Sequence, residues 1–322
     1  MKVLVSGAGG FLGRHVTERL LARGHSVRAI VRPASEPPAW TGDVELFRAD
    51  LRSHENLGSA FDGVDAVLHL AAATSGSEDA QFASTVVASE RFFSAMAASA
   101  VKRVIHVSSL VVYDWARVKG TMDETSPLLL NPYDMGGYTI AKMWQERVLG
   151  HFAREHGWDV TVARPGFIWG PQHAEIAGMG RHFGRIYLMF GPLTRLPLCH
   201  VVNCAHFLVA AAENSAAVGQ TFNVIDTDDV RVWHYVREYA RRTGQPGLMF
   251  PLPYSAGHGL ALLAALTSRV LFGEKGKLPS LLTPRRFQSQ FKPIRFSNRK
   301  SKQVLGWEPP LSFDQCLVST YG

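Results

Sequence analysis

A tyrosine and a lysine stand four residues apart in the run Tyr138-Thr139-Ile140-Ala141-Lys142. In a helix, residues i and i+4 share one face and lie roughly 5–6 Å apart, so these two side chains can act together. A lysine ammonium favours the ionised form of a nearby phenol. Because a free phenol has a reference pKa of about 10, such a shift would make Tyr138 useful as an acid–base group near neutral pH.

Two further signals lie upstream of this pair. The pair Ser108-Ser109 ends a strand-like run, and the turn Gly7-Ala8-Gly9-Gly10-Phe11-Leu12-Gly13 joins an expected strand to an expected helix. Glycines allow a tight turn and close approach of a pyrophosphate, and a helix N-terminus favours anions. The turn alone could be a strand–helix junction without a ligand. Together, the three signals predict hydride transfer to or from a nicotinamide dinucleotide.

The end of the second expected strand bears on the choice between NADP and NAD. It reads Ala29-Ile30-Val31-Arg32, with no carboxylate to bond the ribose 2′-hydroxyl of NAD. An arginine suits the 2′-phosphate of NADP, as a charge-assisted and bidentate partner. We therefore expect NADP(H). NAD(H) is the alternative, if Arg32 is a solvated loop charge that stacks on adenine or does nothing.

The elements that must position these residues alternate along the first half of the chain. Continuous apolar strands separated by helices predict a parallel sheet covered on both faces. Helices are expected over Phe11 to Arg23, around Phe82 to Ala100 and over Gly136 to His156. The expected strands are Val3-Leu4-Val5, Val27 to Val31, Val44 to Phe47, Ala66 to Leu70, Val104 to Val107 and Val160 to Ala163.

The second half of the chain is less regular. Residues 166–198 are rich in Gly, Pro and aromatics with little period, and order returns over Ala205 to Glu213, Thr221 to Ile225 and Val232 to Arg242. We expect an α/β fold, a Rossmann doubly wound parallel sheet with a smaller, discontinuous C-terminal substrate lobe. The core would comprise residues 1–165 plus about 199–226, and the lobe about 166–198 plus 227–322.

Composition bounds the function classes. The 322 residues are 46% hydrophobic and 19% charged, which is typical of a folded globular protein. A net charge of +7 favours anionic ligands, but no basic–aromatic module accompanies it, so nucleic-acid binding is not expected. Three cysteines make no disulfide framework and no signal peptide is visible, which predicts a cytoplasmic location. No apolar run reaches the ~18 residues that span a bilayer.

The order of the motifs resembles the extended short-chain dehydrogenase/reductase superfamily. That superfamily includes nucleotide-sugar epimerases, dihydroflavonol-reductase-like enzymes and 3β-type hydroxysteroid dehydrogenases, and the resemblance covers nearly the whole chain. The resembling elements are Gly7-x-x-Gly10-x-x-Gly13, Asp50-Leu51, His69-Leu70-Ala71-Ala72, Val107-Ser108-Ser109, Tyr138-x-x-x-Lys142, Arg164-Pro165, Gly170-Pro171, His200-Val201-Val202-Asn203 and Leu305-Gly306-Trp307-x-Pro309.

The resemblance implies roles for individual residues. Ser109 would hold the carbonyl oxygen, with Ser108 as its near competitor for that role. Tyr138 would be the acid/base, and Lys142 would bond the nicotinamide ribose and bias Tyr138 toward ionisation. Asp50 and Leu51 would meet the adenine, Ala71 and Ala72 the pyrophosphate and ribose, and Pro165 the nicotinamide. The full expected cofactor set is Gly7, Gly10, Phe11, Leu12, Gly13, Arg32, Asp50, Leu51, Leu70, Ala71, Ala72, Ser108, Tyr138, Lys142 and Pro165.

Three departures from the family pattern are visible. Thr85 stands where an Asn is frequent, and Asp114 stands where glycine usually follows Val-Tyr, so the proton relay and the local loop shape stay open. Phe167 stands where sugar-nucleotide members often place an Asn. An apolar wall suits a hydrophobic substrate better than a sugar diphosphate. Ile168, Phe183 and Tyr187 are weaker substrate candidates, since such aromatics can simply fill the core of the lobe.

We therefore expect an NADP(H)-dependent oxidoreductase that interconverts a carbonyl and a secondary alcohol on a relatively hydrophobic ketone or aldehyde, for example in secondary metabolism. Three alternatives stay open. They are a nucleotide-sugar epimerase or dehydratase with retained NAD(P), an NAD-linked hydroxysteroid-type dehydrogenase, and a non-catalytic cofactor-binding regulator. The family often dimerises through the helix that bears the tyrosine and lysine, so a homodimer is an expectation from the resemblance.

Two segments carry further hypotheses. The run Cys199 to His206 holds four soft or borderline ligands, but their spacing matches no usual zinc pattern, so no metal is expected. The run Leu260 to Phe272 is apolar nearly all round, which predicts a buried or dimer-contact helix. The alternative is that one face closes the substrate pocket or makes a peripheral membrane contact, with Arg269 and Lys275 reaching anionic headgroups.

Overall fold

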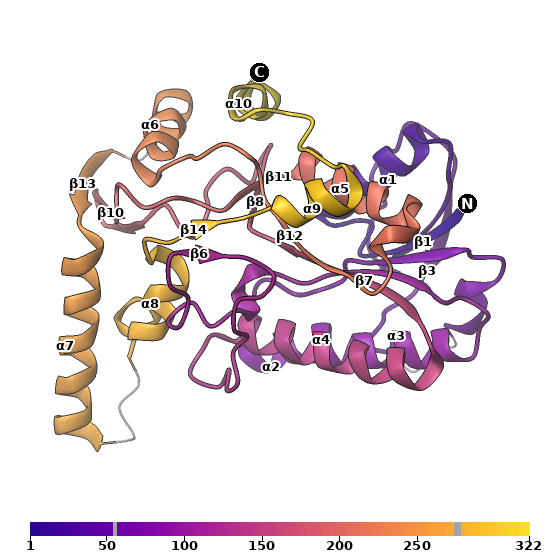
Figure 1. Ribbon diagram of the computed structural model, residues 1–322, viewed down its shortest axis with the longest axis horizontal. Coiled ribbons are helices and arrows are strands. Elements are labelled where there is room, and N and C mark those ends of the chain that lie inside the picture. Colours follow the sequence, from indigo (N-terminus) through magenta and orange to yellow (C-terminus); the bar gives the residue numbers. More distant parts are fainter. Residues whose placement is uncertain (54–56, 246, 274–277) are drawn as a thin grey trace.

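A seven-stranded parallel sheet lies at the centre of the protein, in a computed structural model that describes residues 1–53, 57–245, 247–273 and 278–322 (Figure 1). The strand order is β12-β7-β5-β4-β1-β2-β3, and every neighbouring pair is parallel. This confirms the predicted doubly wound sheet. The strands are β1 (Lys2–Ser6), β2 (Ser26–Val31), β3 (Val44–Arg48), β4 (Ala66–His69), β5 (Arg103–Val107), β7 (Asp159–Pro165) and β12 (Thr221–Val224).

The chain direction across the sheet reverses between β1 and β4. From β1 the chain steps to β2 and β3 on one side, and then returns to β4, β5 and β7 on the other. In open parallel sheets a ligand binds at such a switch point, beyond the carboxyl ends of the strands. The glycine turn follows β1 and residues 70–72 follow β4, so both predicted cofactor segments lie at this point.

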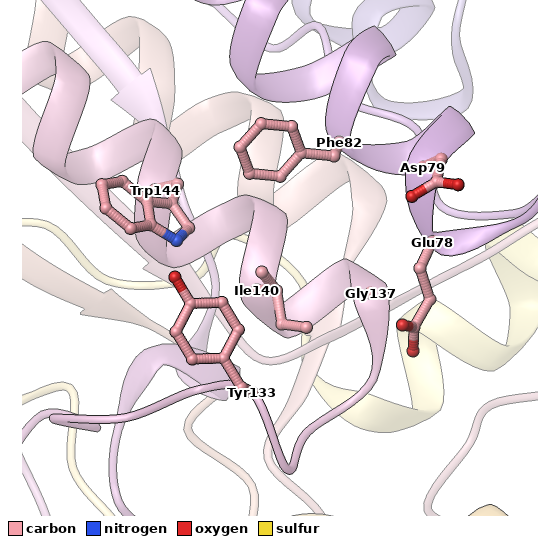
Figure 2. Close-up of a pocket in the computed structure, with 7 residues that line it drawn as sticks. All are labelled: Glu78, Asp79, Phe82, Tyr133, Gly137, Ile140 and Trp144. Atoms are coloured by element: carbon pink, nitrogen blue, oxygen red, sulfur yellow. The ribbon is translucent and has the colours of Figure 1, made fainter.

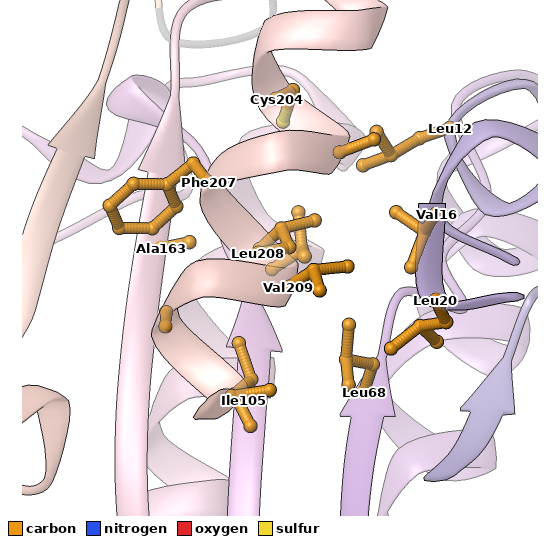
Figure 3. Close-up of a cluster of buried hydrophobic side chains, with 14 of the residues drawn as sticks. Leu12, Val16, Leu20, Leu68, Ile105, Ala163, Cys204, Phe207, Leu208 and Val209 are labelled. Carbon is orange, nitrogen blue, oxygen red and sulfur yellow. The ribbon is translucent and has the colours of Figure 1, made fainter. Parts of the chain in front are cut away.

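Helices cover both faces of the sheet (Figure 1). On one face α1 (Phe11–Ala22) packs against α5 (Val201–Glu213). Figure 3 shows leucine and valine side chains of these two helices meeting over the strands. On the other face lie α3 (Ala88–Ala97) and α4 (Gly137–His156), and aromatic residues fill the layer beneath them. The amphipathic periodicity of these helices, with apolar residues on the side toward the sheet, is what places them there.

The helix expected around Phe82 to Ala100 is longer and less regular than predicted. It begins as α2 (Glu78–Phe82), capped by the Ser77 hydroxyl, and continues through the π-helical turn η2 (Ala83–Val87) into α3. Single π-helical turns inside α-helices are frequent at functional sites. This one carries Thr85 beside the predicted active site.

The smaller part of the molecule is built from short elements. Residues 166–198 hold three strands of three to five residues, too short for the sequence to show a period. A three-stranded sheet has the order β13-β10-β9, and two pairs, β11-β8 and β14-β6, accompany it. The strands are β6 (Thr121–Met122), β8 (Phe167–Trp169), β9 (Arg181–Phe183), β10 (Ile186–Phe190), β11 (Leu198–His200), β13 (Leu248–Leu252) and β14 (Arg295–Phe296).

Four short helices complete this part: α6 (Val232–Thr243), α8 (Pro284–Phe291), α9 (Arg299–Leu305) and α10 (Phe313–Tyr321). Its main core gathers Trp169, Tyr187, Tyr235 and Phe313. The expected division of the chain into a core of 1–165 plus about 199–226 and a lobe from the remainder stays a proposal.

The helix expected over the apolar run Leu260 to Phe272 differs from its prediction. It runs as α7 (Tyr254–Phe272), six residues earlier than the apolar run begins, and most of its leucines are exposed. The prediction of a helix buried in the core is therefore wrong, because the side that packs inward carries small residues instead. Lys275, expected to act with this helix, lies outside the described residues. Within the described ranges, no helix is long and apolar enough to cross a membrane.

Candidate active site

The glycine turn is shaped by contacts that exclude side chains. Gly7 has a φ of +76°, and a Cβ there would lie 3.0 Å from the Ala71 amide nitrogen. A Cβ on Gly13 would lie 2.1 Å from the Gly7 carbonyl oxygen, so α1 starts directly against the turn. The Gly10 amide donates to that same carbonyl at 3.0 Å. The turn and the N-terminus of α1 therefore form a close-fitting cradle that suits a pyrophosphate.

The predicted residues around the cradle lie close to it. Leu70 donates its amide to the Ser6 carbonyl at 3.2 Å, and the Ala71 amide reaches the Ser6 hydroxyl at 3.4 Å. Ala72 follows, half-buried. Within α1, Leu12 is buried, and the ring of half-buried Phe11 stacks on His173 with a centroid distance of 4.0 Å.

Arginines gather at the adenosine end of the predicted site. Arg32 is exposed just after β2, and Asp50 and buried Leu51 follow β3. The Arg52 guanidinium donates to both Asp50 oxygens, at 3.0 Å and 2.6 Å. This pairing lowers the pKa of Asp50 to about 2, with a smaller contribution from the charge of Arg32. Arg48 donates to the carbonyls of the loop that follows Arg32. The positive charge at this end suits a phosphate group.

The side chains of Ser109 and Tyr138 lie close enough for the Ser109 hydroxyl to act on the Tyr138 phenol. Ser109 follows β5, and its hydroxyl also accepts the Val111 amide at 3.4 Å. Tyr138 lies in the first turn of α4. Burial raises the pKa of Tyr138 above its ordinary value, and the nearby Ser109 hydroxyl opposes that rise. The competitor Ser108 is buried, and its hydroxyl has no hydrogen-bond partner among the described residues. Ser108 and Ser109 both follow β5, and Pro165 ends the neighbouring β7.

The hydrogen-bond partners of the Lys142 amine are Val107 and Gln145. The amine donates to the Val107 carbonyl at 2.8 Å and to the Gln145 amide oxygen at 2.9 Å. Burial lowers the pKa of Lys142 to about 7, with the charge of Glu146 opposing. Burial and the Ser109 hydroxyl act on the Tyr138 pKa here, and the expected effect of Lys142 on it stays a prediction.

Gln145 is a residue that the sequence reasoning missed. Its side chain is fully buried, and its amide nitrogen donates to the Ala71 carbonyl at 3.0 Å and to the Ser89 hydroxyl at 2.8 Å. Gln145 therefore joins Lys142 to the segment that lines the predicted pyrophosphate path. The signal was its i+3 spacing from Lys142, which places both on one helix face.

His69 extends this network toward the glycine turn. Its Nδ1 lies 2.7 Å from the Ser6 hydroxyl and its Nε2 lies 2.8 Å from the Ser89 hydroxyl. Burial, with a smaller contribution from the Lys142 charge, lowers the pKa of His69 to about 3, so the ring is neutral. A neutral ring can both donate and accept, which lets a chain of hydrogen bonds run from Lys142 to Ser6.

Two of the three departures from the family pattern, Thr85 and Asp114, have hydrogen-bond partners. The Thr85 hydroxyl accepts the Ala73 amide at 2.9 Å, and its carbonyl accepts the Ser89 hydroxyl at 2.6 Å, so both groups are engaged beside the site. Asp114 accepts from Arg285 of α8 at 3.2 Å. Asp114 thus helps hold α8 against the loop after Ser109.

The four substrate candidates fall into two groups. Phe167 and Ile168 are half-buried in β8, two and three residues beyond Pro165. Phe183 is 51% exposed in β9, whereas Tyr187 is 1% exposed in the core of the smaller part. A substrate contact through Tyr187 is therefore not expected, because its ring is covered by the core itself. In the Cys199 to His206 segment, β11 ends at His200 and α5 begins at Val201. Among the described residues, no three His, Cys, Asp or Glu side chains lie together in a way that could hold a metal ion.

A hollow of about 340 Å³ lies on the outer side of α2 and α4. Figure 2 shows Phe82, Tyr133 and Trp144 around it. Its α4 residues, Gly137, Ile140 and Trp144, lie on a different helix face from Tyr138, Lys142 and Gln145. The hollow is therefore distinct from the Ser109/Tyr138 site.

The NAD dependent epimerase/dehydratase family matches residues 3–224, a span that contains the glycine turn, Ser109, Tyr138 and Lys142. The chain belongs to this family. Its more similar relatives include oxidoreductases of the extended short-chain type, and the chain is an NAD(P)-dependent oxidoreductase of that type.

Among the relatives of this epimerase/dehydratase family member is a 4-hydroxy-2-methyl-3-oxo-4-farnesyl-3,4-dihydroquinoline-1-oxide ketoreductase of Stigmatella aurantiaca. It is 28% identical over 84% of this chain and 82% of the relative. A 2-alkyl-3-oxoalkanoate reductase of Stenotrophomonas maltophilia is 26% identical over 98% of this chain and 97% of the relative. The decarboxylating sterol-4-alpha-carboxylate 3-dehydrogenase of Mus musculus is 25% identical over 99% and 90%.

Solved structures show the same fold for this family member. The UDP-glucuronic acid 4-epimerase of Bacillus cereus, in complex with UDP-glucuronic acid and NAD, has a TM-score of 0.73 at 17% identity, covering 100% of this chain and 98% of that one. MoeE5 in complex with UDP-glucuronic acid and NAD has a TM-score of 0.72 at 21% identity, covering 99% and 97%.

Proposed function

We propose that this protein reduces a ketone or aldehyde on a relatively hydrophobic small molecule with NADPH, by a reversible reaction. The observation that carries the proposal is the proximity of Ser109, which follows β5, to Tyr138, which lies on α4 with Lys142 one turn further, at the edge of the sheet where the glycine turn also lies. This arrangement brings a proton donor and an oxygen-binding hydroxyl next to a dinucleotide cradle.

The chain's residues divide the chemistry among them. Bound NADPH would supply the hydride that attacks the carbonyl carbon. Ser109 would donate a hydrogen bond to the carbonyl oxygen, and Tyr138 would give that oxygen the proton that completes the alcohol. A raised pKa keeps Tyr138 protonated, which suits a proton donor in the reductive direction. Lys142, held by Gln145, would bond the nicotinamide ribose.

NADP(H) is favoured by the charges at the adenosine end. Exposed Arg32 follows β2 where an acidic residue would be needed to bond a ribose hydroxyl. The one carboxylate of that end which the sequence singled out, Asp50, is already paired with Arg52. A 2′-phosphate would therefore meet cations there, and NAD(H) would lose that interaction.

A hydrophobic substrate is supported by the wall and by the relatives. Phe167 and Ile168 place an apolar surface just beyond Pro165. The names of three relatives describe farnesyl, alkyl and sterol substrates. These proteins differ among themselves in substrate, so the proposal for this chain extends to the apolar class alone.

The test is turnover with purified protein. NADPH and NADH are offered with long-chain 3-oxo acids and with steroid ketones, and in parallel NAD with UDP-glucose. We expect NADPH consumption with at least one apolar carbonyl compound, at a rate that Tyr138→Phe abolishes. Epimerisation of the sugar nucleotide by protein that retains its cofactor would instead establish the epimerase alternative and overturn the proposal.

A further inference from the structure

In helix α7 the small residues face the protein and the large apolar residues face outward. Its inward side carries small residues, and a Cβ on Gly257 would lie 2.5 Å from the ring of Phe287 in α8. One turn further along, Ala261 is fully buried, and Ala264, Ala265 and Ser268 are half-buried. Helices approach closely through such small residues. The side of α7 that is fitted for helix packing is therefore already occupied by this chain.

The outward side of α7 is a band of large apolar side chains. Over the last three turns the helix exposes leucine and valine, with fractional exposures between 50% and 75%. Figure 1 shows the helix at the left-hand edge of the molecule, away from the central sheet. Isolated exposed leucines are common on proteins, but a contiguous band is not. The exposed members are Leu260, Leu262, Leu263, Leu266, Val270 and Leu271.

The small sheet before α7 extends this band. In its register Ile186 pairs with Leu248 and with Phe183, and Leu188 pairs with Phe250, so these side chains share one face. The same face carries Phe190 and Leu252, which pack with α7 and α8 in one apolar cluster.

The uncovered end of that sheet face thus lies on the same side as α7. Phe183, Ile186, Leu248 and Phe250 are all 40% or more exposed. We call the exposed residues of α7 together with these four the apolar face.

The charge of the surrounding sequence is one-sided. Between Glu238 and Glu308 there are twelve lysines and arginines against one acidic residue, Glu274. Five of these cations form ion pairs with carboxylates, namely Arg241, Arg242, Arg285, Arg286 and Lys302. Within α7 the one charged residue is Arg269, exposed in its last turn, and exposed Arg185 lies in the turn between β9 and β10. Long cationic side chains at the border of an apolar surface can bury their stems and reach anionic groups. This charge pattern complements the headgroup region of an acidic bilayer.

We propose that the apolar face docks on the surface of an anionic lipid bilayer, with α7 lying in the plane of the interface. Two observations favour a bilayer over a second copy of the chain. The small residues that close helix pairing needs face inward, and the two charged residues identified at the border of the face, Arg269 and Arg185, are both cations. No described helix can span a membrane, so α7 lies in the surface. The inference does not rest on the proposed reaction, because docking needs neither cofactor nor substrate.

The experiment is vesicle flotation with the full-length protein. Vesicles of phosphatidylcholine are compared with vesicles that also contain phosphatidylglycerol. The test variant carries Leu263→Gln and Leu266→Gln, two exposed positions where glutamine keeps helix propensity. The control variant carries Leu130→Gln and Val318→Gln, which are 81% and 68% exposed outside the apolar face.

We expect wild type and the control variant to float with the anionic vesicles. The affinity of the test variant for these vesicles should be at least about tenfold lower, because its two glutamines no longer bury the apolar area of leucine in the bilayer. Binding should also weaken in about 0.5 M salt, where the Debye length is short. Absence of flotation with anionic vesicles, or equal loss in both variants, would overturn the proposal. So would a wild-type dimer that the test variant converts to monomer while vesicle binding is unchanged.

Discussion

At the residue scale, the structure places Tyr138 in contact with Ser109 while Lys142 is held elsewhere. Burial disfavours the charged form of both side chains. It raises the pKa of Tyr138 and lowers the pKa of Lys142 to about 7. Both shifts favour the neutral forms. Burial therefore favours a protonated Tyr138 and leaves Lys142 partly protonated near neutral pH.

The ionisation of Tyr138 can be measured directly. In cofactor-free protein we expect its tyrosinate to appear only above the ordinary phenol pKa, since burial disfavours the charged form. The measurement is the tyrosinate absorbance of wild type minus that of Tyr138→Phe, followed as pH rises. A difference signal that titrates near neutral pH without cofactor would contradict this arrangement.

Gln145 should matter through Lys142. Gln145→Leu removes the acceptor of one Lys142 bond and leaves the amine and the Ser89 hydroxyl short of partners, which costs about 1–3 kcal/mol per buried group. We expect weaker NADPH binding and a lower kcat. Gln145→Glu, which keeps an acceptor for Lys142, should retain more NADPH affinity than Gln145→Leu. Met143→Leu, a buried change on the same helix, serves as control. If both Gln145 variants matched the control in cofactor affinity and kcat, Gln145 would have no positioning role.

Arg32 should set the cofactor preference. Arg32→Asp replaces a cation by an anion where the 2′-phosphate is expected, and a charge-assisted hydrogen bond is worth about 1.5–3 kcal/mol, or roughly tenfold or more in affinity. Titration of NADPH and NADH into both proteins at fixed salt measures the ratio. Arg154→Asp, a change at an exposed arginine of α4, should leave the ratio unchanged. Tighter NADH than NADPH binding by wild type would sink the assignment.

At the element scale, the glycine turn depends on backbone contacts that no side chain can share. Gly13 meets the Gly7 carbonyl, and its added Cβ at 2.1 Å would force α1 away from the turn. Regular elements with long apolar periods were predictable from sequence: six of the seven parallel strands and α4 lie within a few residues of their expected ranges. The seventh strand, β12, lies in the stretch Thr221 to Ile225, which was expected only to be ordered. The strands of residues 166–198 were not predictable, because three to five residues cannot show a period.

Orientation was the second limit of the sequence. An all-apolar run such as Leu260 to Phe272 does not tell which side packs, and here the small residues rather than the leucines face inward. The hydrogen bond between Gln145 and His69 could not be predicted either. His69 lies in β4 and Gln145 lies in α4, so their contact depends on how the helix packs on the sheet.

Gly13→Ala tests the element scale. The clash with backbone atoms leaves no flexible group to move, so we expect loss of NADPH binding by tenfold or more, as read by cofactor fluorescence titration. Gly150→Ala in the middle of α4 is the matched control. Its Cβ would meet only the flexible Arg154 side chain, and alanine should stabilise the helix by about 0.5–1 kcal/mol. Unchanged NADPH affinity in Gly13→Ala would contradict the cradle.

At the scale of the whole molecule, Arg285 joins the two parts. From α8 its guanidinium donates to Asp134 at 2.7 Å and to Asp114 at 3.2 Å, both in loops near the Ser109/Tyr138 site. We expect Arg285→Ala to raise KM for the carbonyl substrate with NADPH affinity little changed, since α8 is then held less firmly. Arg295→Ala, an exposed arginine of β14 with no such bonds, is the comparison. Equal KM values in the two variants would show that the Arg285 ion pairs do not affect binding of the carbonyl substrate.

The central claim is hydride transfer from NADPH to a carbonyl carbon with Tyr138 as proton donor. It is tested most directly with NADPH deuterated at the transferable position of the nicotinamide ring, mixed with an apolar ketone that the protein accepts, and mass spectrometry of the product. The account predicts an alcohol that carries one deuterium from wild type, and none above background from Tyr138→Phe with its NADPH affinity intact. Product without deuterium, or undiminished deuterated alcohol from Tyr138→Phe, would contradict it.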